Sequence, residues 1–410
     1  MLDKKIVLKR GREKAILNRH HWIFSGAIKS APEFEDGDIL PVFSFDNKFL
    51  GQAYFNRKTS IAGRMLSFAP PSSCLRCGYG RQACGTSEDK CDVLKVIEEN
   101  VKNAIELRKI FFDLKNTNSY RLINSEGDFL PGLIVDKYND VLVIQIGTLG
   151  MEKLKANIIK ILVAELDPVG IYEKSDSPSR LEEGLESFEG KIFGTVPDEI
   201  EILENGNKFL IEVKKGQKTG FYFDQREMRK LVGNLVKNKK VLNCFSYTGG
   251  FSVYAMKSKA LKVDSIDISK DSVSLLEKNF KLNNLDIKNN NFFVGDVFEY
   301  LRNEKLDYDF IILDPPAFCK TKNEIVDACR GYKEINRLAI EKIKPKSLIL
   351  TCSCSYFVDE KLFQQVIFQA AVDANRKVRI IQKHHLALDH PINIFHPEGN
   401  YLKSLLLYIE

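Results

Sequence analysis

The sequence of 410 residues has no apolar run approaching the roughly 18 residues that a membrane-spanning helix needs. Its start, Met1 to Arg10, carries charges where a signal peptide needs an apolar stretch. We therefore expect a cytoplasmic protein. The sequence also lacks internal repeats and low-complexity tracts, and its apolar fraction of 44% is ordinary for a globular protein.

Two nucleotide-binding motifs are also missing. No glycine-rich loop ends in the lysine that holds the phosphates of a nucleoside triphosphate, which disfavours such a ligand. No Gly-x-Gly-x-x-Gly turn follows a strand, which disfavours a nicotinamide cofactor.

No strong excess of one charge is present, because the net charge is only +6. The positive charge is nevertheless clustered. Residues 1–70 hold twelve Lys and Arg against seven Asp and Glu, and residues 205–240 hold ten against three. Such clusters suit a polyanion such as RNA. A solvated basic surface is the alternative, and charge alone does not separate the two.

The nine cysteines should not form a disulfide framework in a cytoplasmic chain. Four of them lie in one short loop with few apolar residues, at Cys74, Cys77, Cys84 and Cys91. Four thiolates can hold one structural zinc ion or an iron–sulfur cluster. Unligated thiols in an insertion are the alternative. Any metal here should be structural.

The chain is too long for one hydrophobic core, so we expect several domains. Residues 1–70 contain short apolar stretches, with a hairpin signal at Asp46-Asn47, and predict a small β-rich domain. Residues 71–91 form the cysteine-rich insertion. Residues 92–204 combine helical spacing over Val93–Phe112 with strand-like runs, which predicts an α+β middle domain.

Residues 205–410 read differently, because short strand-like runs alternate with helical stretches after about residue 225. This alternation predicts an α/β domain with a doubly wound parallel sheet. The expected strands are Lys240–Cys244, Val263–Ile268, Asn291–Val294, Phe310–Leu313 and Leu348–Thr351. The expected helices cover 251–258, 270–282, 297–303, 331–343 and 359–374.

Ligands of such a sheet bind at the carboxyl ends of the strands. The first strand leads into a turn whose two glycines allow a close approach of backbone to ligand; its residues include Asn243, Phe245, Tyr247, Thr248, Gly249 and Gly250. The second strand ends at Asp267, which is placed to accept from ribose hydroxyls. The third leads to Asp296, which could accept from an adenine amino group.

The fourth strand ends in Asp314-Pro315-Pro316. The two prolines stiffen the backbone and hold the acid against a planar acceptor. The motif is typical of methyltransferases that act on nucleobases or amide nitrogens. A stiff exit from a strand would explain this motif alone. It would not explain four glycine-rich or acidic strand ends in order.

The whole chain resembles the bacterial large-subunit (23S) ribosomal RNA cytosine-5 methyltransferases. The motifs that carry the resemblance are His21-Trp-Ile-Phe-Ser-Gly26, Glu126–Asp136, Gly220–Arg226, Asn243–Phe251, Asp314-Pro-Pro, Cys329-Arg-Gly-Tyr-Lys333, Ser353-Cys354-Ser355, His390-Pro and Pro397-Glu-Gly. The cysteine insertion departs from the family's ordinary members.

The resemblance implies an N-terminal PUA-type RNA-binding domain, a mixed α/β middle domain and a class I (Rossmann-like) methyltransferase domain that uses S-adenosylmethionine. It implies that Gln225 and Arg226 belong to the cofactor site. It also implies ribosomal RNA as the partner, as free RNA or as an assembly intermediate.

Methylation of cytosine C5 needs a cysteine, because C5 becomes nucleophilic only after a thiolate adds to C6. The family motif aligns this nucleophile with Cys354, and Cys352 is the fallback; their spacing puts both on one face if the strand persists. Both could instead be buried hydrophobes. Asp314 would bind the N3/N4 edge of the base and support protonation.

Several points stay open. Many such enzymes carry a second cysteine after the motif's proline, but that place is Ala317 here, and Cys319 follows two residues on. The base that removes the C5 proton is therefore unassigned. The alternative functions are methylation of a guanine or adenine nitrogen and a non-enzymatic ribosome-assembly factor. The oligomeric state is open, with a homodimer among the alternatives.

Overall fold

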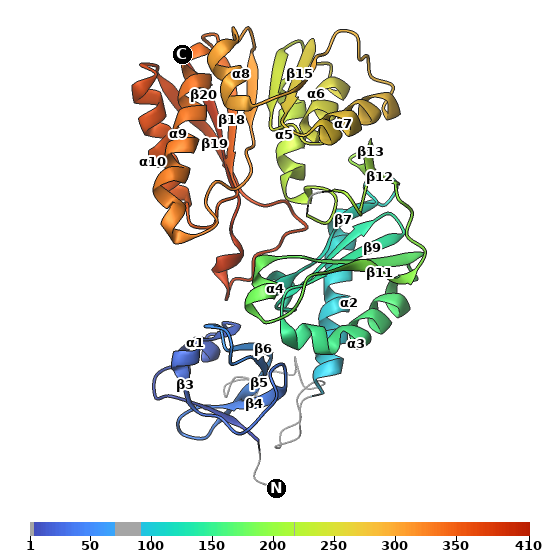
Figure 1. Cartoon of the computed structure of the whole chain (residues 1–410), viewed down its shortest axis with the longest axis vertical. Helices are drawn as coiled ribbons and strands as arrows, with labels where there is room; N and C mark the ends of the chain where they lie inside the picture. The colour runs from blue at the N-terminus through green and yellow to red at the C-terminus, as the bar shows by residue number, and fades with distance from the viewer. Residues whose placement is uncertain (1–3, 70–91, 217) are drawn as a thin grey trace.

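A computed structural model of the chain describes residues 4–69, 92–216 and 218–410. Three bodies follow one another along the long axis, with the N-terminus at one end and the C-terminus at the other (Figure 1). The four clustered cysteines, on which the metal prediction rests, lie outside the described residues. No helix among the described residues has the length and apolarity to span a membrane.

The N-terminal body is a six-stranded sheet in the order β2-β6-β5-β4-β1-β3. The predicted hairpin is confirmed: β4 pairs antiparallel with β5, and Asn47 in the turn has a φ of 61°. The elements are β1 (Ile6–Leu8), α1 (Lys14–Leu17), β2 (Trp22–Ile23), β3 (Ile28–Ser30), β4 (Ile39–Phe43), β5 (Phe49–Phe55) and β6 (Gly63–Phe68).

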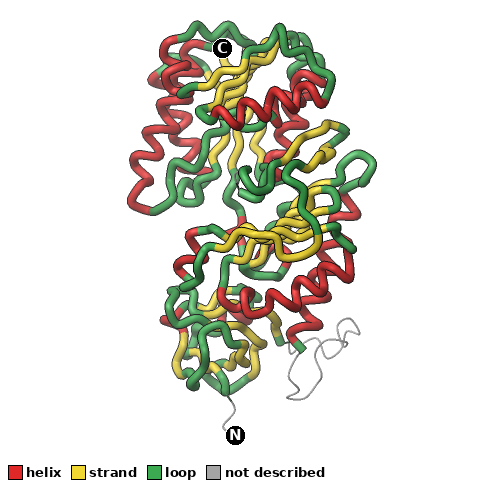
Figure 2. The backbone as a smooth tube through the Cα atoms, turned by 45° about the vertical axis from the view of Figure 1, so that its right-hand side comes forward, coloured by secondary structure: helices red, strands yellow, loops and turns green. Residues whose placement is uncertain are grey.

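The middle body is a five-stranded sheet in the order β11-β10-β9-β8-β7. Its two long helices pack against one face of the sheet (Figures 1 and 2). The predicted helix at Val93–Phe112 is confirmed to within one residue. The elements are α2 (Val93–Phe111), β7 (Ser119–Asn124), β8 (Leu133–Tyr138), β9 (Val141–Ile146), α3 (Leu149–Leu166), β10 (Gly170–Ser175), α4 (Pro178–Glu182) and β11 (Phe188–Gly194).

A hairpin of β12 (Ile200–Glu204) and β13 (Asn207–Ile211) joins the middle body to the C-terminal body. The predicted boundary between 204 and 205 therefore falls inside a single antiparallel unit. The hairpin shares one apolar core with both neighbours, because Phe209 packs in a cluster with Tyr138 of β8 and Phe280.

The C-terminal body is a seven-stranded sheet in the order β16-β15-β14-β17-β18-β20-β19. The five predicted strands are present and parallel. They are β14 (Lys240–Cys244), β15 (Lys262–Asp267), β16 (Phe292–Val294), β17 (Phe310–Leu313) and β18 (Ser347–Ser353). The sequence analysis assigned neither β19 (Val378–His384) nor β20 (Lys403–Ile409), which lies antiparallel between β18 and β19.

Helices cover both faces of this sheet, as expected of a doubly wound domain. Helices α8, α9 and α10 pack in the cluster on one face, and α5 and α6 pack in the cluster on the other. The bounds are α5 (Arg226–Leu235), α6 (Gly250–Lys257), α7 (Lys270–Leu282), α8 (Val297–Asn303), α9 (Ile325–Lys342) and α10 (Glu360–Asp373).

The chain between β19 and β20, residues 385–402, returns to the other two bodies and is here named the returning segment (Figure 1). Its Asn393 donates a 3.1 Å hydrogen bond to the carbonyl of Glu126. Its Glu398 lies 3.3 Å from His20 of the N-terminal body. The segment thus links all three bodies and brings residues 401–403 back to the end of β18.

Candidate active site

The turn after β14 is built to approach a ligand closely. Phe245, Tyr247 and Gly249 all have positive φ values, of 58°, 45° and 82°. A Cβ on Gly249 would come within 2.5 Å of the Leu276 side chain, so a larger residue does not fit there. Helix α6 begins directly afterwards at Gly250, which directs its N-terminal N–H groups toward the strand ends.

Polar atoms without partners gather around this turn. Asn243 donates a 2.8 Å hydrogen bond to Ser252, but its Oδ1 has no partner among the described residues. The same holds for the hydroxyls of Ser246 and Thr248, which are also buried. Buried polar atoms are rarely left unpaired. These residues therefore fit a polar ligand at the carboxyl edge.

The two predicted adenosine-binding acids lie at this edge. Asp267 ends β15, and its two oxygens accept backbone hydrogen bonds from Tyr247 at 2.8 Å and Ser269 at 2.9 Å. It is partly exposed, so lone pairs remain for a ligand. Asp296 is exposed and caps helix α8 through a 2.9 Å bond from the N–H of Glu299. Its second oxygen remains available.

Gln225 and Arg226 separate in the structure, although they are neighbours in the chain. Gln225, in the short helix η4 (Phe223–Gln225), donates a 2.8 Å hydrogen bond to Asp314 Oδ1. Arg226 instead pairs with Glu204 and Asp389 and is only 1% exposed. Its guanidinium is held between the bodies by these two acids, so of the two residues only Gln225 contacts Asp314, and the cofactor role of Arg226 stays a prediction.

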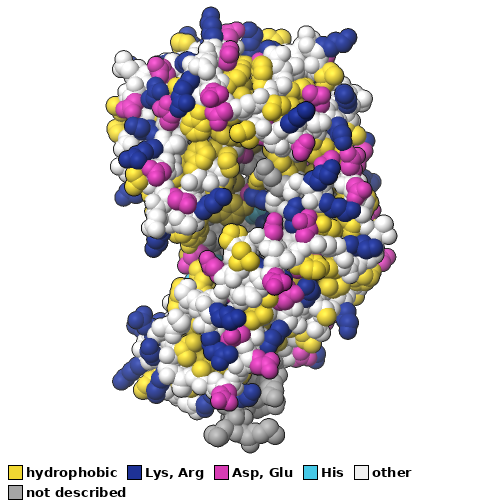
Figure 3. Space-filling model, viewed as in Figure 1, with side chains coloured by type: hydrophobic (Ala, Val, Ile, Leu, Met, Phe, Trp, Pro, Cys, Tyr) yellow, Lys and Arg dark blue, Asp and Glu magenta, His cyan; other side chains and the backbone are white. Residues whose placement is uncertain are grey.

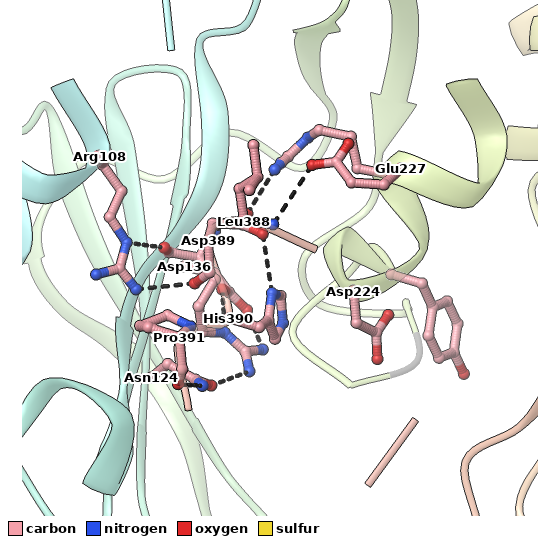
Figure 4. A network of polar contacts seen from close by, with 12 residues as sticks. Arg108, Asn124, Asp136, Asp224, Glu227, Leu388, Asp389, His390 and Pro391 are labelled. Atoms are coloured by element: carbon pink, nitrogen blue, oxygen red, sulfur yellow. Dashed lines mark hydrogen bonds and ion pairs between the residues drawn. The ribbon is translucent and has the colours of Figure 1, made fainter. Parts of the chain in front are cut away.

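Asp389 belongs to a polar network that holds the returning segment between the middle body and α5 (Figure 4). Asp389 accepts from the N–H of Arg121 at 2.9 Å and lies 2.9 Å from His390 Nδ1. Its carbonyl accepts from Arg108 at 2.8 Å. The Asn124 amide donates to the carbonyl of Pro391 at 3.1 Å. This network fixes the path that leads to Tyr401.

Asp314 directly follows β17, which ends at Leu313, and accepts the hydrogen bond from Gln225. Burial, followed by the nearby Asp224 carboxylate, raises the pKa of Asp314 to about 7. The Gln225 hydrogen bond acts in the opposite direction. A carboxyl with such a pKa can accept or donate a proton near neutral pH, which suits general acid–base chemistry.

The two candidate cysteines differ sharply. Strand β18 ends at Ser353, so the condition that would place both on one face is not met. Cys352 is fully buried among apolar side chains of the sheet. Cys354 follows the strand and is partly exposed, with its Sγ 3.9 Å from the carbonyl of Pro315. Cys354 is the better placed, beside the Asp-Pro-Pro turn.

Cys319 does not replace the missing second cysteine. It is 2% exposed, and its Sγ lies 3.1 Å from the carbonyl of Thr321. Its backbone N–H donates to the Ser355 hydroxyl. Burial raises its pKa above the usual value. Its contacts serve the turn around Ser355.

The sequence analysis missed a cluster of charged and phenolic groups at the same edge. Asp224 accepts hydrogen bonds from Lys218 at 3.0 Å and from Tyr401 at 2.7 Å. Lys403 lies at the start of β20, with its ammonium against the carbonyl of Ser355. Their separation in sequence gives no local signal. Figure 3 shows the surface hollowed between the C-terminal body and the bodies below it.

Two family matches divide the chain. Residues 6–68 match the PUA-like domains, and residues 186–373 match the S-adenosylmethionine-dependent methyltransferases. These matches confirm the predicted fold class, a class I methyltransferase domain preceded by a PUA-like domain and a mixed α/β body.

Full-length relatives are also found. Ribosomal RNA large subunit methyltransferase I of Aeromonas salmonicida is 39% identical over 407 residues, which is 98% of each chain. The protein of the same name from Cronobacter sakazakii is 36% identical and covers 100% of each chain.

Two solved structures match the whole fold. A Streptococcus mutans protein, provisionally assigned as a SAM-dependent methyltransferase, has a TM-score of 0.80 and 24% identity, over 99% of this chain and 100% of that one. A second structure, a provisionally assigned methyltransferase in complex with SAH, has a TM-score of 0.81 and 25% identity, over 100% of both chains.

Proposed function

The chain belongs to the ribosomal RNA large subunit methyltransferase I family, and we propose that it methylates C5 of a cytosine in 23S rRNA. The coarser activity, S-adenosylmethionine-dependent methylation of large-subunit ribosomal RNA, rests on the full-length relatives and the matched domain. The finer assignment to cytosine C5 rests on Cys354 and Asp314.

The cofactor would lie along the carboxyl edge of the sheet. Asp267 would accept from its ribose hydroxyls, and the turn from Asn243 to Gly250 would pack against it. Asp296 and Gln225 would complete the polar contacts. Bound there, S-adenosylmethionine supplies an electrophilic methyl group. The residues fit it because Asn243, Ser246 and Thr248 each keep a buried polar atom without a partner among the described residues.

The reaction at the base begins with Cys354. Its thiolate adds to cytosine C6, which turns C5 into a nucleophile. Asp314 would hold the N3/N4 edge and give a proton to the ring nitrogen, since its pKa of about 7 allows the carboxyl to carry one at neutral pH. After methylation, loss of the C5 proton re-forms the ring double bond and releases the thiol.

The observation that carries this proposal is the position of Cys354. It follows β18, beside the Asp314-Pro-Pro turn, while the other candidate, Cys352, is fully buried. The basic residues of 1–70 and 205–240 would provide phosphate contacts for the RNA.

Trapping the covalent adduct tests the proposal. Ribosomal RNA carrying 5-fluorocytosine at the target cannot lose a C5 proton, so the adduct should persist as a slowly migrating band on a denaturing gel. The band should require S-adenosylmethionine and should vanish in Cys354→Ala. A Cys329→Ala variant, which changes a partly buried cysteine on α9, is the matched control and should keep the band.

Two other outcomes would revise the proposal. If Cys352→Ala abolishes the band and Cys354→Ala keeps it, the nucleophile is Cys352. If methylated RNA still forms when both cysteines are removed together, the cytosine-5 assignment fails. Methylation of a base nitrogen then becomes the preferred assignment. The Asp-Pro-Pro motif is also typical of that chemistry, and burial raises the pKa of the Cys354 thiol to about 11, which disfavours the thiolate.

A further inference from the structure

Lys403 is a buried cation without an acidic partner. It is the first residue of β20 and is 3% exposed. Its Nζ donates hydrogen bonds to two backbone carbonyls, of Ser355 at 2.6 Å and Tyr401 at 2.8 Å. No carboxylate of the described residues lies within ion-pair distance of it. Asp359 acts on it only from farther away.

This arrangement is costly. An ammonium loses its hydration on burial, and neutral carbonyls replace that hydration only in part. Burial accordingly lowers the pKa of Lys403 to about 8. Lys174, another buried lysine, also donates to two carbonyls but has the Glu189 carboxylate 4.0 Å away. Lys403 has no carboxylate of the described residues at a comparable distance. Its surroundings therefore fit an anion that forms only during the reaction.

The position of Lys403 indicates which anion this is. In the register of β18 and β20, Lys403 lies opposite Ser353, the residue before Cys354. Its ammonium binds the carbonyl of Ser355, the residue after Cys354. The Ser355 hydroxyl is itself fixed by Tyr332 at 2.9 Å and by the N–H of Cys319 at 3.1 Å. The turn that carries Cys354 is therefore rigid and bound to the ammonium.

We propose that Lys403 is the counter-charge of the Cys354 thiolate, a positioning residue that stabilises the reactive form of the nucleophile. At neutral pH, below the Lys403 pKa of about 8, ionisation of the thiol breaks the S–H bond and sends its proton to solvent, while Lys403 keeps its own proton. The inference rests on the proposed function, in which Cys354 is the nucleophile.

The other groups that face Cys354 are less suited to balance the charge of a thiolate. Asp314 and Asp224 are carboxylates and oppose a thiolate. Lys218 favours it, but its ammonium is already paired with Asp224 and is 40% exposed on the side chain. Tyr222, Tyr332 and Tyr401 all have raised pKa values and stay neutral at ordinary pH. Lys403, in contrast, has no carboxylate of the described residues within ion-pair distance.

The experiment measures thiol reactivity, not methyl transfer. The full-length protein, without RNA or S-adenosylmethionine, is treated with iodoacetamide over a range of pH. The alkylation rate of the Cys354 peptide is followed by mass spectrometry, because only the thiolate reacts. The variants are Lys403→Met and Lys403→Arg. Lys342→Met is the matched control, since Lys342 also donates to backbone carbonyls but lies at the end of α9, before β18 begins.

In Lys403→Met, the Cys354 alkylation rate below about pH 8, where wild-type Lys403 carries its proton, should fall about ten-fold, which corresponds to a shift of one unit in the pKa of the thiol. Lys403→Arg should restore most of the rate, and Lys342→Met should match the wild type. An unchanged profile in a folded Lys403→Met variant overturns the inference. If that variant does not fold, Lys403→Gln takes its place under the same criterion.

The same data separate this inference from the proposed function. If wild-type protein forms no adduct with 5-fluorocytosine RNA but the Lys403→Met profile shifts, the proposed chemistry fails and the charge relation stands. If the adduct forms and the profile does not shift, the proposed chemistry stands and the charge relation between Lys403 and Cys354 fails. An equal loss of rate in Lys403→Met and Lys403→Arg would indicate a steric role and would also overturn the inference.

Discussion

The Gln225 side chain donates a 2.8 Å hydrogen bond to Asp314 and so ties the short helix before α5 to the end of β17. Both residues lie at the carboxyl edge of the sheet, yet they are 89 positions apart in the chain. The Gln225 Oε1 is buried and has no partner among the described residues. The amide therefore orients the acid and keeps one acceptor free for a ligand.

Replacing Gln225 by Leu should reduce methylation about ten- to hundred-fold, because losing a hydrogen bond to a charged group costs roughly 1.5–3 kcal/mol. The donated bond lowers the pKa of Asp314, so its loss should also move the pH profile of kcat/KM to higher pH. Rates measured across about pH 6 to 9 check both effects. Gln364→Leu, which removes an exposed contact with Lys383, is the control and should change neither.

The buried Asp314 should also cost stability. Its pKa is about 7 in the folded protein against an ordinary value of 3.8, so the folded state holds a proton that the unfolded chain has released between these values. Stability from this group is therefore present at low pH and falls as the pH rises toward 7. We expect Asp314→Asn, without cofactor, to be more stable than the wild type above pH 7, by at most about 4 kcal/mol.

Denaturant unfolding of both proteins near pH 8 and near pH 5 checks this expectation. The difference between them should shrink at the lower pH, where the wild-type carboxyl is protonated. A constant difference would mean that Asp314 titrates normally in the folded state. The variant should lose methylation at both pH values.

The sequence predicted the parallel strands well because each is a short apolar run whose local pattern decides its structure. Asp267, Asp296 and Asp314 follow such runs, so their common edge could be predicted. The contacts of Tyr401 and Lys403 could not, because these residues reach Asp224 and the carbonyl of Ser355 only when β20 enters the sheet antiparallel beside β18. That pairing joins distant residues and leaves no periodic signal nearby.

For Arg226, the local motif did not predict the partners of the side chain. The residue is the neighbour of Gln225, and the family motif suggested one site for both. Arg226 is one residue farther along, and its side chain points into the contact between the bodies, where it pairs with Glu204 and Asp389. The shared face of Cys352 and Cys354 was predicted only for a strand that continues past Ser353, and β18 ends there. Patterns predict elements better than they predict the direction of side chains at the ends of those elements.

Asp267→Ala should weaken binding of S-adenosylmethionine by about 1.5–3 kcal/mol, the usual cost of losing a charged hydrogen-bond partner. Calorimetry on the purified protein checks this value. Because Asp267 also accepts from the N–H groups of Tyr247 and Ser269, the variant must be shown to be folded by circular dichroism. Asp271→Ala, on the first turn of α7, is the control. Unchanged affinity in folded Asp267→Ala would remove Asp267 from the site.

Glu204 should be important for stability, because it lies at the centre of a buried ion network between the bodies. Its carboxylate accepts from Arg229 at 2.6 and 2.7 Å, from Arg226 at 3.2 Å and from the Tyr254 hydroxyl at 2.9 Å. Glu204 is fully buried, and the two guanidinium groups are almost so. Removing its charge leaves two buried cations facing the single Asp389 carboxylate, which pairs with Arg226.

We therefore expect Glu204→Gln to lower the free energy of unfolding by about 3–5 kcal/mol, the usual cost of breaking a buried pair by removing one partner. The matched control lies on the same strand. Glu201 pairs with Lys208 at 2.8 Å, but both side chains are 47% exposed, so Glu201→Gln should change stability by less than about 1 kcal/mol. Urea unfolding of the three proteins, followed by far-UV circular dichroism, compares them directly. Equal midpoints for the two variants would contradict a network that holds β12 against α5.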